Sequence, residues 1–195
     1  PGRLISKLEH ITKTYGEQII LKDAHAEIIN GDKIALIGAN GLGKSTVLRI
    51  IAGTEPHDGK VQMGYNVIPS FYAQHQLESL DMRHNMVEEL QYSAPKRTEN
   101  EIRTVLGCFL FTGDEVFKKL KVLSGGEKAR IALAKTILSD ANYLMLDEPT
   151  NHLDYQSVNI LTQALQNYEG SFIIVSHDRQ FIRDTANKIW WIEDH

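Results

Sequence analysis

A glycine-rich loop between an apolar run and a helical run constrains this chain more than any other segment. Gly38 to Ser45 reads GANGLGKS and matches the pattern G-x-x-x-x-G-K-[ST]. The apolar run Lys33 to Ile37 precedes the loop, and Ser45 to Gly53, STVLRIIAG, has helical periodicity. Because this pattern binds phosphate when it joins a strand to a helix, we expect a strand, a phosphate cradle and a helix here.

Phosphate chemistry explains each part of this loop. Glycines let backbone N–H groups wrap around phosphate oxygens, and the N-terminus of the following helix favours negative charge. Lys44 would reach the β- and γ-phosphates, and the hydroxyl of Ser45 would ligate Mg²⁺. The residues expected to bind the nucleotide are Gly38, Asn40, Gly41, Leu42, Gly43, Lys44, Ser45 and Thr46. The alternative, a glycine-rich turn with a chance lysine, is disfavoured by the flanking strand and helix.

A second apolar run supplies the carboxylates that such a loop requires. Tyr143 to Leu146 reads as a buried strand that ends at Asp147 and Glu148. Asp147 would hold the magnesium shell, and Glu148 would orient the attacking water. Alone, the segment could equally be a polar strand end. The presence of the phosphate loop makes the catalytic interpretation the stronger one.

A serine and two glycines at the start of a predicted helix form a third element. Ser124, Gly125, Gly126 and Glu127 would present open backbone N–H groups, a hydroxyl and a positive helix end. That is a second anion site, for which a domain with one phosphate loop has no evident use. The simpler interpretation is that Ser124 is an N-cap and that the glycines ease the turn.

The remaining pattern predicts an α/β fold, a P-loop core with a mostly parallel sheet and a small antiparallel β part near the N-terminus. Pro69 places its strand at an edge or a bulge. The expected strands are 27–29, 33–37, 60–63, 66–73, 143–146, 172–175 and an edge strand at 189–192. The expected helices are 45–53, 86–92, 99–106, 116–120, 126–138 and 155–168. Residues 1–195 would form one domain, with 1–76 and 124–195 as the core and about 77–123 as an inserted helical subdomain.

Composition narrows the class of protein. The apolar runs fall far short of the about 20 residues that a membrane span requires. The formal net charge of −4 offers no general basic field that would attract nucleic acid. Cys108 is the only cysteine, which excludes an internal disulfide and fits a reducing compartment such as the cytoplasm. Five histidines, His10, His25, His57, His75 and His84, show no metal-ligand spacing.

The order of these motifs resembles the ABC ATPase family, over about Leu4 to Glu193. Gly38 to Thr46 is similar to its Walker A, Ser124 to Glu127 to its signature and Tyr143 to Glu148 to its Walker B. The resemblance implies ATP and Mg²⁺ as ligands. It also implies catalytic roles for Lys44, Glu148 and the switch histidine His177, which closes the strand at 172–175.

The resemblance assigns roles to further positions. Tyr15 would stack on adenine, and Gln74 would be the Q-loop glutamine that senses magnesium or the attacking water, with Gln76 as the alternative. Asn151, His152, Leu153 and Asp154 would form the D-loop.

Pairing, again implied by the resemblance, accounts for the second anion site. In the family two domains meet head to tail, so that each ATP lies between the Walker A of one and the signature of the other. Ser124, Gly125 and Gly126 would therefore touch an ATP held by a second ABC domain, supplied by the same full-length chain or by a second copy.

The segment Glu148 to Asp154, EPTNHLD, is similar to the ABC-F branch, whose members act on ribosomes and generally hold two such domains with a helical linker. This chain has one domain and no linker, so we expect it to be a piece of a longer protein. Two alternatives stay open. One is the ATP-binding subunit of a membrane transporter, which residues Asn151 to Asp154 disfavour. The other is a nucleotide-gated binding module with little hydrolysis, which Glu148 disfavours.

Overall fold

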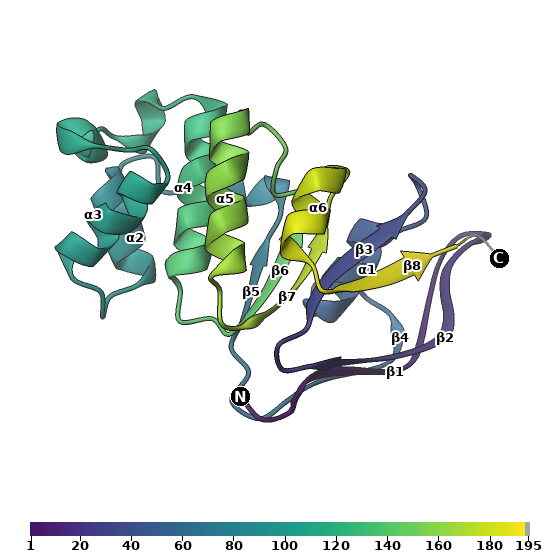
Figure 1. Ribbon diagram of the computed structural model, residues 1–195. Coiled ribbons are helices and arrows are strands. Elements are labelled where there is room, and N and C mark those ends of the chain that lie inside the picture. The colour runs from purple at the N-terminus through teal and green to yellow at the C-terminus, as the bar shows by residue number, and fades with distance from the viewer. Residues whose placement is uncertain (194–195) are drawn as a thin grey trace. The chain divides into compact units, whose positions relative to one another are not determined.

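The computed structural model describes residues 1–193, apart from the side chains of residues 74–76. The strands are β1 (Leu4–Tyr15), β2 (Gln18–Ile29), β3 (Lys33–Gly38), β4 (Asp58–Met63), β5 (Pro69–Tyr72), β6 (Tyr143–Asp147), β7 (Ser171–Val175) and β8 (Lys188–Ile192) (Figure 1). The α-helices are α1 (Lys44–Ile51), α2 (Met86–Ser93), α3 (Glu99–Cys108), α4 (Gly125–Leu138), α5 (Tyr155–Gln166) and α6 (Arg179–Thr185). Three 3-10 helices are η1 (Gln74–Ser79), η2 (Gly113–Phe117) and η3 (Leu120–Val122).

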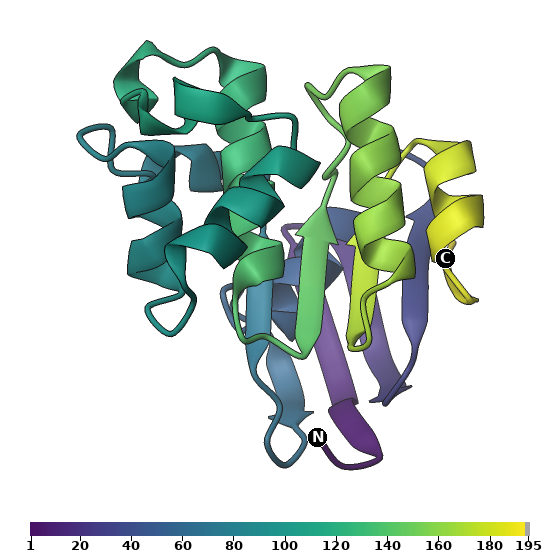
Figure 2. The same ribbon diagram turned by 60° about the vertical axis from the view of Figure 1, so that its left-hand side comes forward.

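A five-stranded sheet with the order β5-β6-β7-β3-β8 forms the centre of the α/β fold. The pairs β6–β7, β7–β3 and β3–β8 are parallel, and Figure 2 shows β5 in blue beside β6 in green. The expected α/β class is confirmed. The strand that contains Pro69 and the strand at 188–192 both lie at edges, as predicted.

An antiparallel sheet with the order β2-β1-β4 makes the small β part expected near the N-terminus. Strand β1 itself was not predicted. Its buried residues Ile5, Leu8 and Ile11 are spaced by three positions, because register shifts relative to β2 break the period of two. The alternation that normally reveals a strand is therefore absent from the sequence of β1.

Helix α1 packs between the two sheets. Its residues Val47, Leu48, Ile50 and Ile51 belong to one buried cluster with side chains of β1, β2, β3, β6 and β7. These apolar residues lie on one side of the helix, and such a stripe is the face by which a helix packs on a core. The phosphate loop thus leads into the best-buried helix of this part of the chain.

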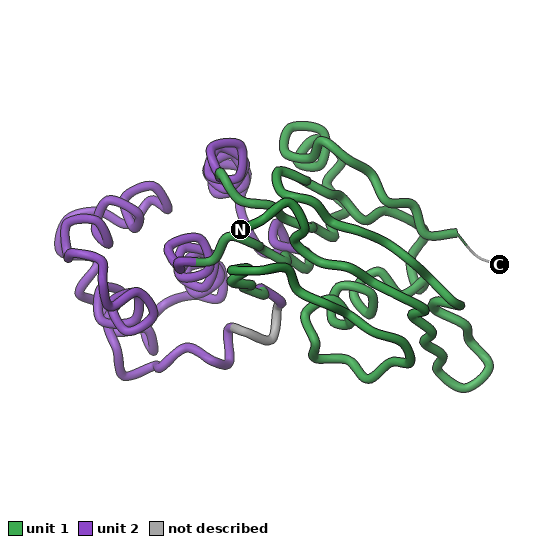
Figure 3. Tube along the Cα trace, turned by 90° about the horizontal axis from the view of Figure 1, so that it is seen from below, with its two compact units in different colours: residues 1–71, 141–147, 169–195 green, residues 72–140, 148–168 purple. Residues whose placement is uncertain are grey.

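The chain separates into two compact units (Figure 3). The first comprises Pro1–Phe71, Ala141–Asp147 and Glu169–His195, with α1, α6 and almost all of both sheets. The second comprises Tyr72–Asp140 and Glu148–Tyr168, with α2 to α5 and the 3-10 helices. Helices α4 and α5 thus group with the helical pieces, and the expected division of the chain into domains stays a prediction.

The second unit is built from capped helices around a buried carboxylate. Asn85, Thr98 and Ser124 each cap a helix by accepting from the N–H of the glutamate three positions later, and each donates its own N–H to the carboxylate of that glutamate. Glu89 of α2 is 2% exposed and accepts hydrogen bonds from Lys135 of α4 at 2.6 Å and from His84 at 2.8 Å. The bond from Lys135 joins α2 to α4, and the bond from His84 fixes the residues that precede α2.

Two local predictions differ from the structure. Residues 116–120 do not form one helix, because Lys118 and Lys119 have extended backbones that separate η2 from η3. Helix α6 was not predicted; Asp178 begins it by accepting a hydrogen bond from the N–H of Phe181. Among the described residues, no helix is long and apolar enough to cross a membrane.

Candidate nucleotide-binding site

The glycine-rich loop lies between β3 and α1, as predicted. Gly41 and Gly43 have φ angles of 81° and 88°, in the left-handed region that favours glycine. A Cβ at Gly43 would also lie 2.5 Å from Cγ2 of Ile20 on β2. The side chain of Gln18 donates to the carbonyl of Gly41 at 2.9 Å. Strand β2 therefore supports the loop from one side, a contact that the sequence did not indicate.

Lys44 is held inside this loop. Its Nζ donates to the carbonyls of Gly38 at 3.0 Å and Ala39 at 2.9 Å, and the residue is 7% exposed. Two carbonyls give the ammonium group only neutral acceptors, whereas phosphate oxygens would offer it full negative charge. This position suits a lysine that binds an anion when one enters the loop.

Ser45 and Asp147 meet although 102 positions separate them. The hydroxyl of Ser45 donates to Oδ1 of Asp147 at 2.9 Å. Asp147 ends β6 beside Val175 of β7, and Leu36 of β3 lies on the other side of Val175. The parallel strands thus bring the loop residue and the carboxylate together where the carboxyl ends of the strands lie.

His177 follows β7 at the same end of the sheet. It comes two residues after Val175, is exposed, and precedes Asp178, the cap of α6. The glycine loop, Asp147 and His177 therefore follow the carboxyl ends of three neighbouring parallel strands. Open α/β sheets bind their ligands at the carboxyl ends of the strands, which is where these residues lie.

Tyr15 belongs to a charged network that the sequence did not reveal. Its hydroxyl donates to Glu55, which also pairs with Lys13 at 2.8 Å and with Arg49 of α1 at 3.2 Å. The hydrogen bond from Lys13 and that from Tyr15 lower the pKa of Glu55 to about 2. Nζ of Lys13 lies 4.6 Å from the centre of the Tyr15 ring, which is 44% exposed. Lys13 and Tyr15 lie about 40 positions before Glu55, so no local pattern in the sequence signals this network.

The signature residues form the N-terminus of α4. The Ser124 hydroxyl accepts from the N–H of Glu127 at 3.2 Å, and the Glu127 carboxylate accepts from the N–H of Ser124 at 2.7 Å. The latter bond holds the pKa of Glu127 below its usual value. The N-cap interpretation is therefore confirmed, and the anion site stays a prediction. Arg130 fastens the next turn, donating to the carbonyl of Phe109 at 2.8 Å.

Two tight turns, 148–151 and 150–153, lead into the predicted D-loop, Asn151 to Asp154. Glu148 and His152 have φ angles of 48° and 63°, left-handed values that are uncommon for such residues. Asp154 ends the segment by capping α5 through the N–H of Ser157 at 2.7 Å. A Cβ at Gly126 would lie 3.2 Å from the carbonyl of His152, so the signature and the D-loop are neighbours within the second unit.

Gln74 and Gln76 carry the remaining predicted role. Their side chains lie outside the described residues, so the Q-loop assignment stays a prediction.

Together, the strand-loop-helix and the carboxylate beside it define an ATP-binding domain of the P-loop class. A family profile described as "ABC transporter" matches residues 21–151. The chain belongs to this family and is an ABC-type ATPase domain. Solved structures share its fold, among them the following two. The "ATP binding subunit of ABC transporter" has a TM-score of 0.80 at 18% identity and covers 97% of this chain and 86% of its own. The dimeric "ATP-binding cassette MJ0796 bound to ADP and Pi" has a TM-score of 0.78 at 24% identity, with 97% and 94% covered.

Curated relatives confirm the expected likeness to the ABC-F branch. The chain is 39% identical to the "Probable ATP-binding protein YheS" of Escherichia coli K12 over 96% of its length, and 44% identical to the "Putative ATP-binding protein YdiF" of Bacillus subtilis, also over 96%. It is 40% identical to "ABC transporter F family member 5" of Arabidopsis thaliana over 99%. The chain spans 30%, 29% and 28% of the lengths of these three proteins.

Proposed function

We propose that this chain binds and hydrolyses ATP as one half of a head-to-tail pair of ABC domains. The observation that carries the proposal is the contact between Ser45 and Asp147, 2.9 Å apart at the end of the glycine loop. A hydroxyl and a carboxylate oxygen so close to a phosphate loop are the arrangement that P-loop ATPases need.

Mg²⁺ fits this pair. Hydroxyl and carboxylate oxygens are hard ligands, and Mg²⁺ is usually bound by one or two such groups together with substrate phosphates. Ser45 and Asp147 would hold the ion, which when bound would neutralise charge on the β- and γ-phosphates. Gln74 is the third proposed ligand.

The chain's own residues divide the rest of the work. Lys44 would exchange its two carbonyl acceptors for phosphate oxygens, and the loop N–H groups from Gly38 to Thr46 would hold the phosphate chain. The exposed ring of Tyr15, positioned by Glu55, would stack on the base. Glu148 would orient the attacking water, and His177 would stabilise the γ-phosphate in the transition state.

Pairing would complete the site. Ser124 uses its oxygen as an acceptor for the N–H of Glu127, and a hydroxyl can still donate one hydrogen bond. We propose that this donor, with Gly125 and Gly126, contacts the γ-phosphate held by a second ABC domain. Asn151 to Asp154 would lie at the same junction, because His152 is the neighbour of Gly126. The similar fold of a dimeric ATP-binding cassette supports this arrangement.

The pair would act on the ribosome, in the cytoplasm, as a timing device whose closure depends on ATP. The likeness to ABC transporter F family member 5 and the NHLD sequence of the D-loop support this assignment. The other candidate is a subunit that drives a membrane permease, and it rests on the likeness in fold to an ATP-binding subunit of an ABC transporter.

The test is Glu148→Gln in the full-length protein. Loss of the water-positioning carboxylate should leave ATP binding intact, reduce hydrolysis at least about 100-fold and trap a closed pair. Hydrolysis at the wild-type rate would contradict the catalytic role. Sedimentation of the trapped protein with ribosomes in a sucrose gradient would support the ribosomal role, and recovery in the membrane fraction would support the permease instead.

A matched control keeps the charge change but moves it away from the site. Glu99 lies in the first turn of α3 and is exposed. Glu99→Gln should bind and hydrolyse ATP as the wild type does.

A further inference from the structure

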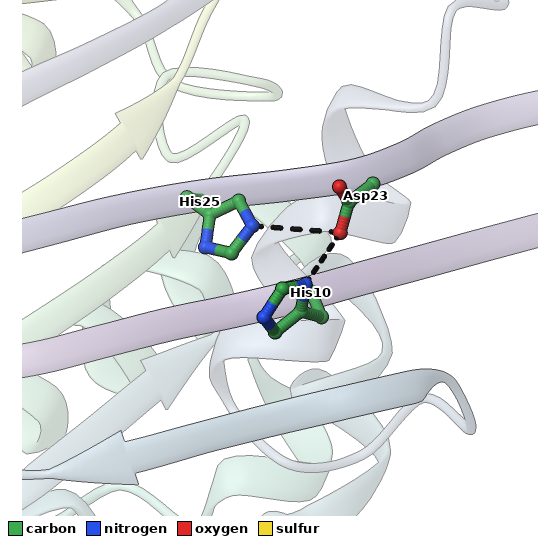
Figure 4. A group of neighbouring side chains, drawn as sticks. All are labelled: His10, Asp23 and His25. Carbon is green, nitrogen blue, oxygen red and sulfur yellow. Dashed lines mark hydrogen bonds and ion pairs between the residues drawn. The ribbon is translucent and has the colours of Figure 1, made fainter.

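Three side chains that can ligate a metal meet on the exposed face of the antiparallel sheet (Figure 4). Nδ1 of His10 lies 2.7 Å from Oδ1 of Asp23, and Nε2 of His25 lies 3.4 Å from the same oxygen. The ligand atoms all lie within 4.8 Å of one another. None of the three residues belongs to the nucleotide site.

Two bulges create this meeting. Between the pairs Leu8–Ala26 and Ile11–Ala24, two residues of β1 face His25 alone, and between Ile11–Ala24 and Lys13–Leu21, two residues of β2 face Thr12 alone. One bulge therefore lies on each strand, and each contains one residue of the cluster. A bulge redirects a side chain relative to the regular alternation of a strand.

The backbone at both bulges is left-handed. His10 has a φ of 54° and Asp23 a φ of 47°, and such values in residues other than glycine persist only where the surroundings impose them. The N–H of Asp23 donates to the hydroxyl of Thr12 at 3.0 Å, which fixes the second bulge. Strained positions of this kind are frequent at ligand sites.

Strand β4 is shaped around the first bulge. A Cβ at Gly59 would lie 2.3 Å from the carbonyl oxygen of His10 and 2.6 Å from that of Glu9. Only glycine fits there. The bulge at His10 is therefore supported from the neighbouring strand and does not depend on contact with Asp23 alone.

We propose that His10, Asp23 and His25 bind a divalent transition-metal ion of the Zn²⁺ type, with solvent completing the coordination. Bond lengths of about 2.0–2.2 Å to nitrogen and oxygen place neighbouring ligand atoms of a tetrahedral zinc about 3.4 Å apart. Nε2 of His25 already lies at this distance from Oδ1 of Asp23 and Nδ1 of His10 lies closer, so small rotations of exposed side chains would suffice. Two imidazoles and a carboxylate favour Zn²⁺ over Mg²⁺ or Ca²⁺.

The carboxylate is suited to the role. A carboxylate oxygen is an ordinary ligand of Zn²⁺, with a bond length close to that of an imidazole nitrogen. The sequence concealed the site, because His10 lies 13 positions from Asp23 and no compact motif connects them. Bound metal would link β1 to β2 beyond their ladder hydrogen bonds.

Isothermal titration calorimetry of the chelator-treated chain with zinc chloride at pH 7.5, without nucleotide, tests the proposal. We expect one site with a dissociation constant in the micromolar range or below. Asp23→Asn and His25→Gln should each weaken it more than about tenfold, since even the outer-shell partners of a metal are worth 10–100-fold. Because all three side chains are exposed, these variants should keep the circular dichroism spectrum of the wild type.

His57→Gln is the matched control. This histidine bonds to the carbonyl of Glu55 at 2.9 Å, outside the cluster, and its variant should bind zinc as the wild type does. Cobalt(II) gives a second measurement, since a visible absorption spectrum typical of tetrahedral coordination by imidazole should appear in the wild type and disappear in His25→Gln. Zinc binding weaker than about 100 µM, or equal affinity in wild type and both cluster variants, would overturn the proposal.

Discussion

The hydroxyl of Ser45 donates to the carboxylate of Asp147 across 102 positions of sequence, at 2.9 Å. The bond shows that the protein's own contacts already place the loop and the end of β6 next to each other. An ion that binds there would replace this hydrogen bond and would not have to bring the two residues together. Asp147 thus has two properties that can be tested apart, its negative charge and its hydrogen bond to Ser45.

Asp147→Asn should remove the charge of this side chain and keep its hydrogen bond. The amide oxygen can still accept from Ser45, so the free energy of unfolding should change by less than about 1 kcal/mol. The lost negative charge should reduce magnesium-dependent ATP hydrolysis by at least about 100-fold. Denaturant unfolding and a phosphate-release assay on the full-length protein measure the two effects. A loss of stability large enough to explain the loss of hydrolysis would argue that Asp147 is mainly structural.

Glu55→Gln should disturb the position of Tyr15, the residue proposed to stack on the base. Because the folded-state pKa of Glu55 is about 2, below the ordinary value of 4.5, its ionic bonds stabilise the protein above pH 4.5 and are lost as the pH falls toward 2. The variant should lower the free energy of unfolding by about 1–2 kcal/mol at pH 7. Its stability should also vary less with pH between 4.5 and 2. Nucleotide affinity, measured by calorimetry, should fall because Tyr15 loses its partner.

Ser124 allows a cap and a phosphate contact to be distinguished. Ser124→Ala removes the cap of α4 and should cost about 1 kcal/mol of stability. Ser124→Asp keeps a good N-cap but places a carboxylate where the γ-phosphate of a second domain is proposed to lie. We expect the aspartate variant to unfold like the wild type and yet to lose hydrolysis in the full-length protein. Wild-type hydrolysis by Ser124→Asp would exclude the proposed contact.

Tyr143→Phe should be neutral or stabilising. The hydroxyl of Tyr143 is buried in the core and has no hydrogen-bond partner among the described residues, and burial raises its pKa. Removing an unsatisfied buried hydroxyl should raise the free energy of unfolding by up to about 1 kcal/mol. Thermal unfolding provides the measurement, and a loss of stability would reveal a bonded hydroxyl.

Glu89→Ala should weaken the helical unit. The buried carboxylate accepts from both Lys135 and His84, and removing one member of a buried ion pair costs about 3 kcal/mol. Far-ultraviolet circular dichroism during urea titration would report it. Glu99→Ala, at an exposed ion pair with Arg103, should cost less than about 1 kcal/mol by the same measurement.

The parts of the fold that the sequence predicts are those in which the local pattern and the required chemistry agree. The loop between β3 and α1 was predictable because glycines, lysine and serine must stand in that order to surround phosphate. Strand β6 was predictable because a continuous apolar run ends in two carboxylates. Both features are contiguous in the sequence.

The features that escaped are produced by tertiary contacts. Strand β1 lost its alternation to bulges, so Ile5, Leu8 and Ile11 do not look like one face of a strand. Glu55 gains its significance only when β1 and α1 bring Lys13 and Arg49 to it. The cluster at His10 likewise depends on the pairing of β1 with β2, which spacing along the chain could not show.

Helix α1 connects two parts of the proposed nucleotide site. Its first residue, Lys44, lies in the phosphate loop, while Arg49, five residues later on the same helix, pairs with Glu55, which also accepts from Tyr15. A substitution that shifted α1 would therefore disturb the phosphate loop and the Tyr15 network together, so that the proposed contacts to the phosphates and to the base would weaken jointly.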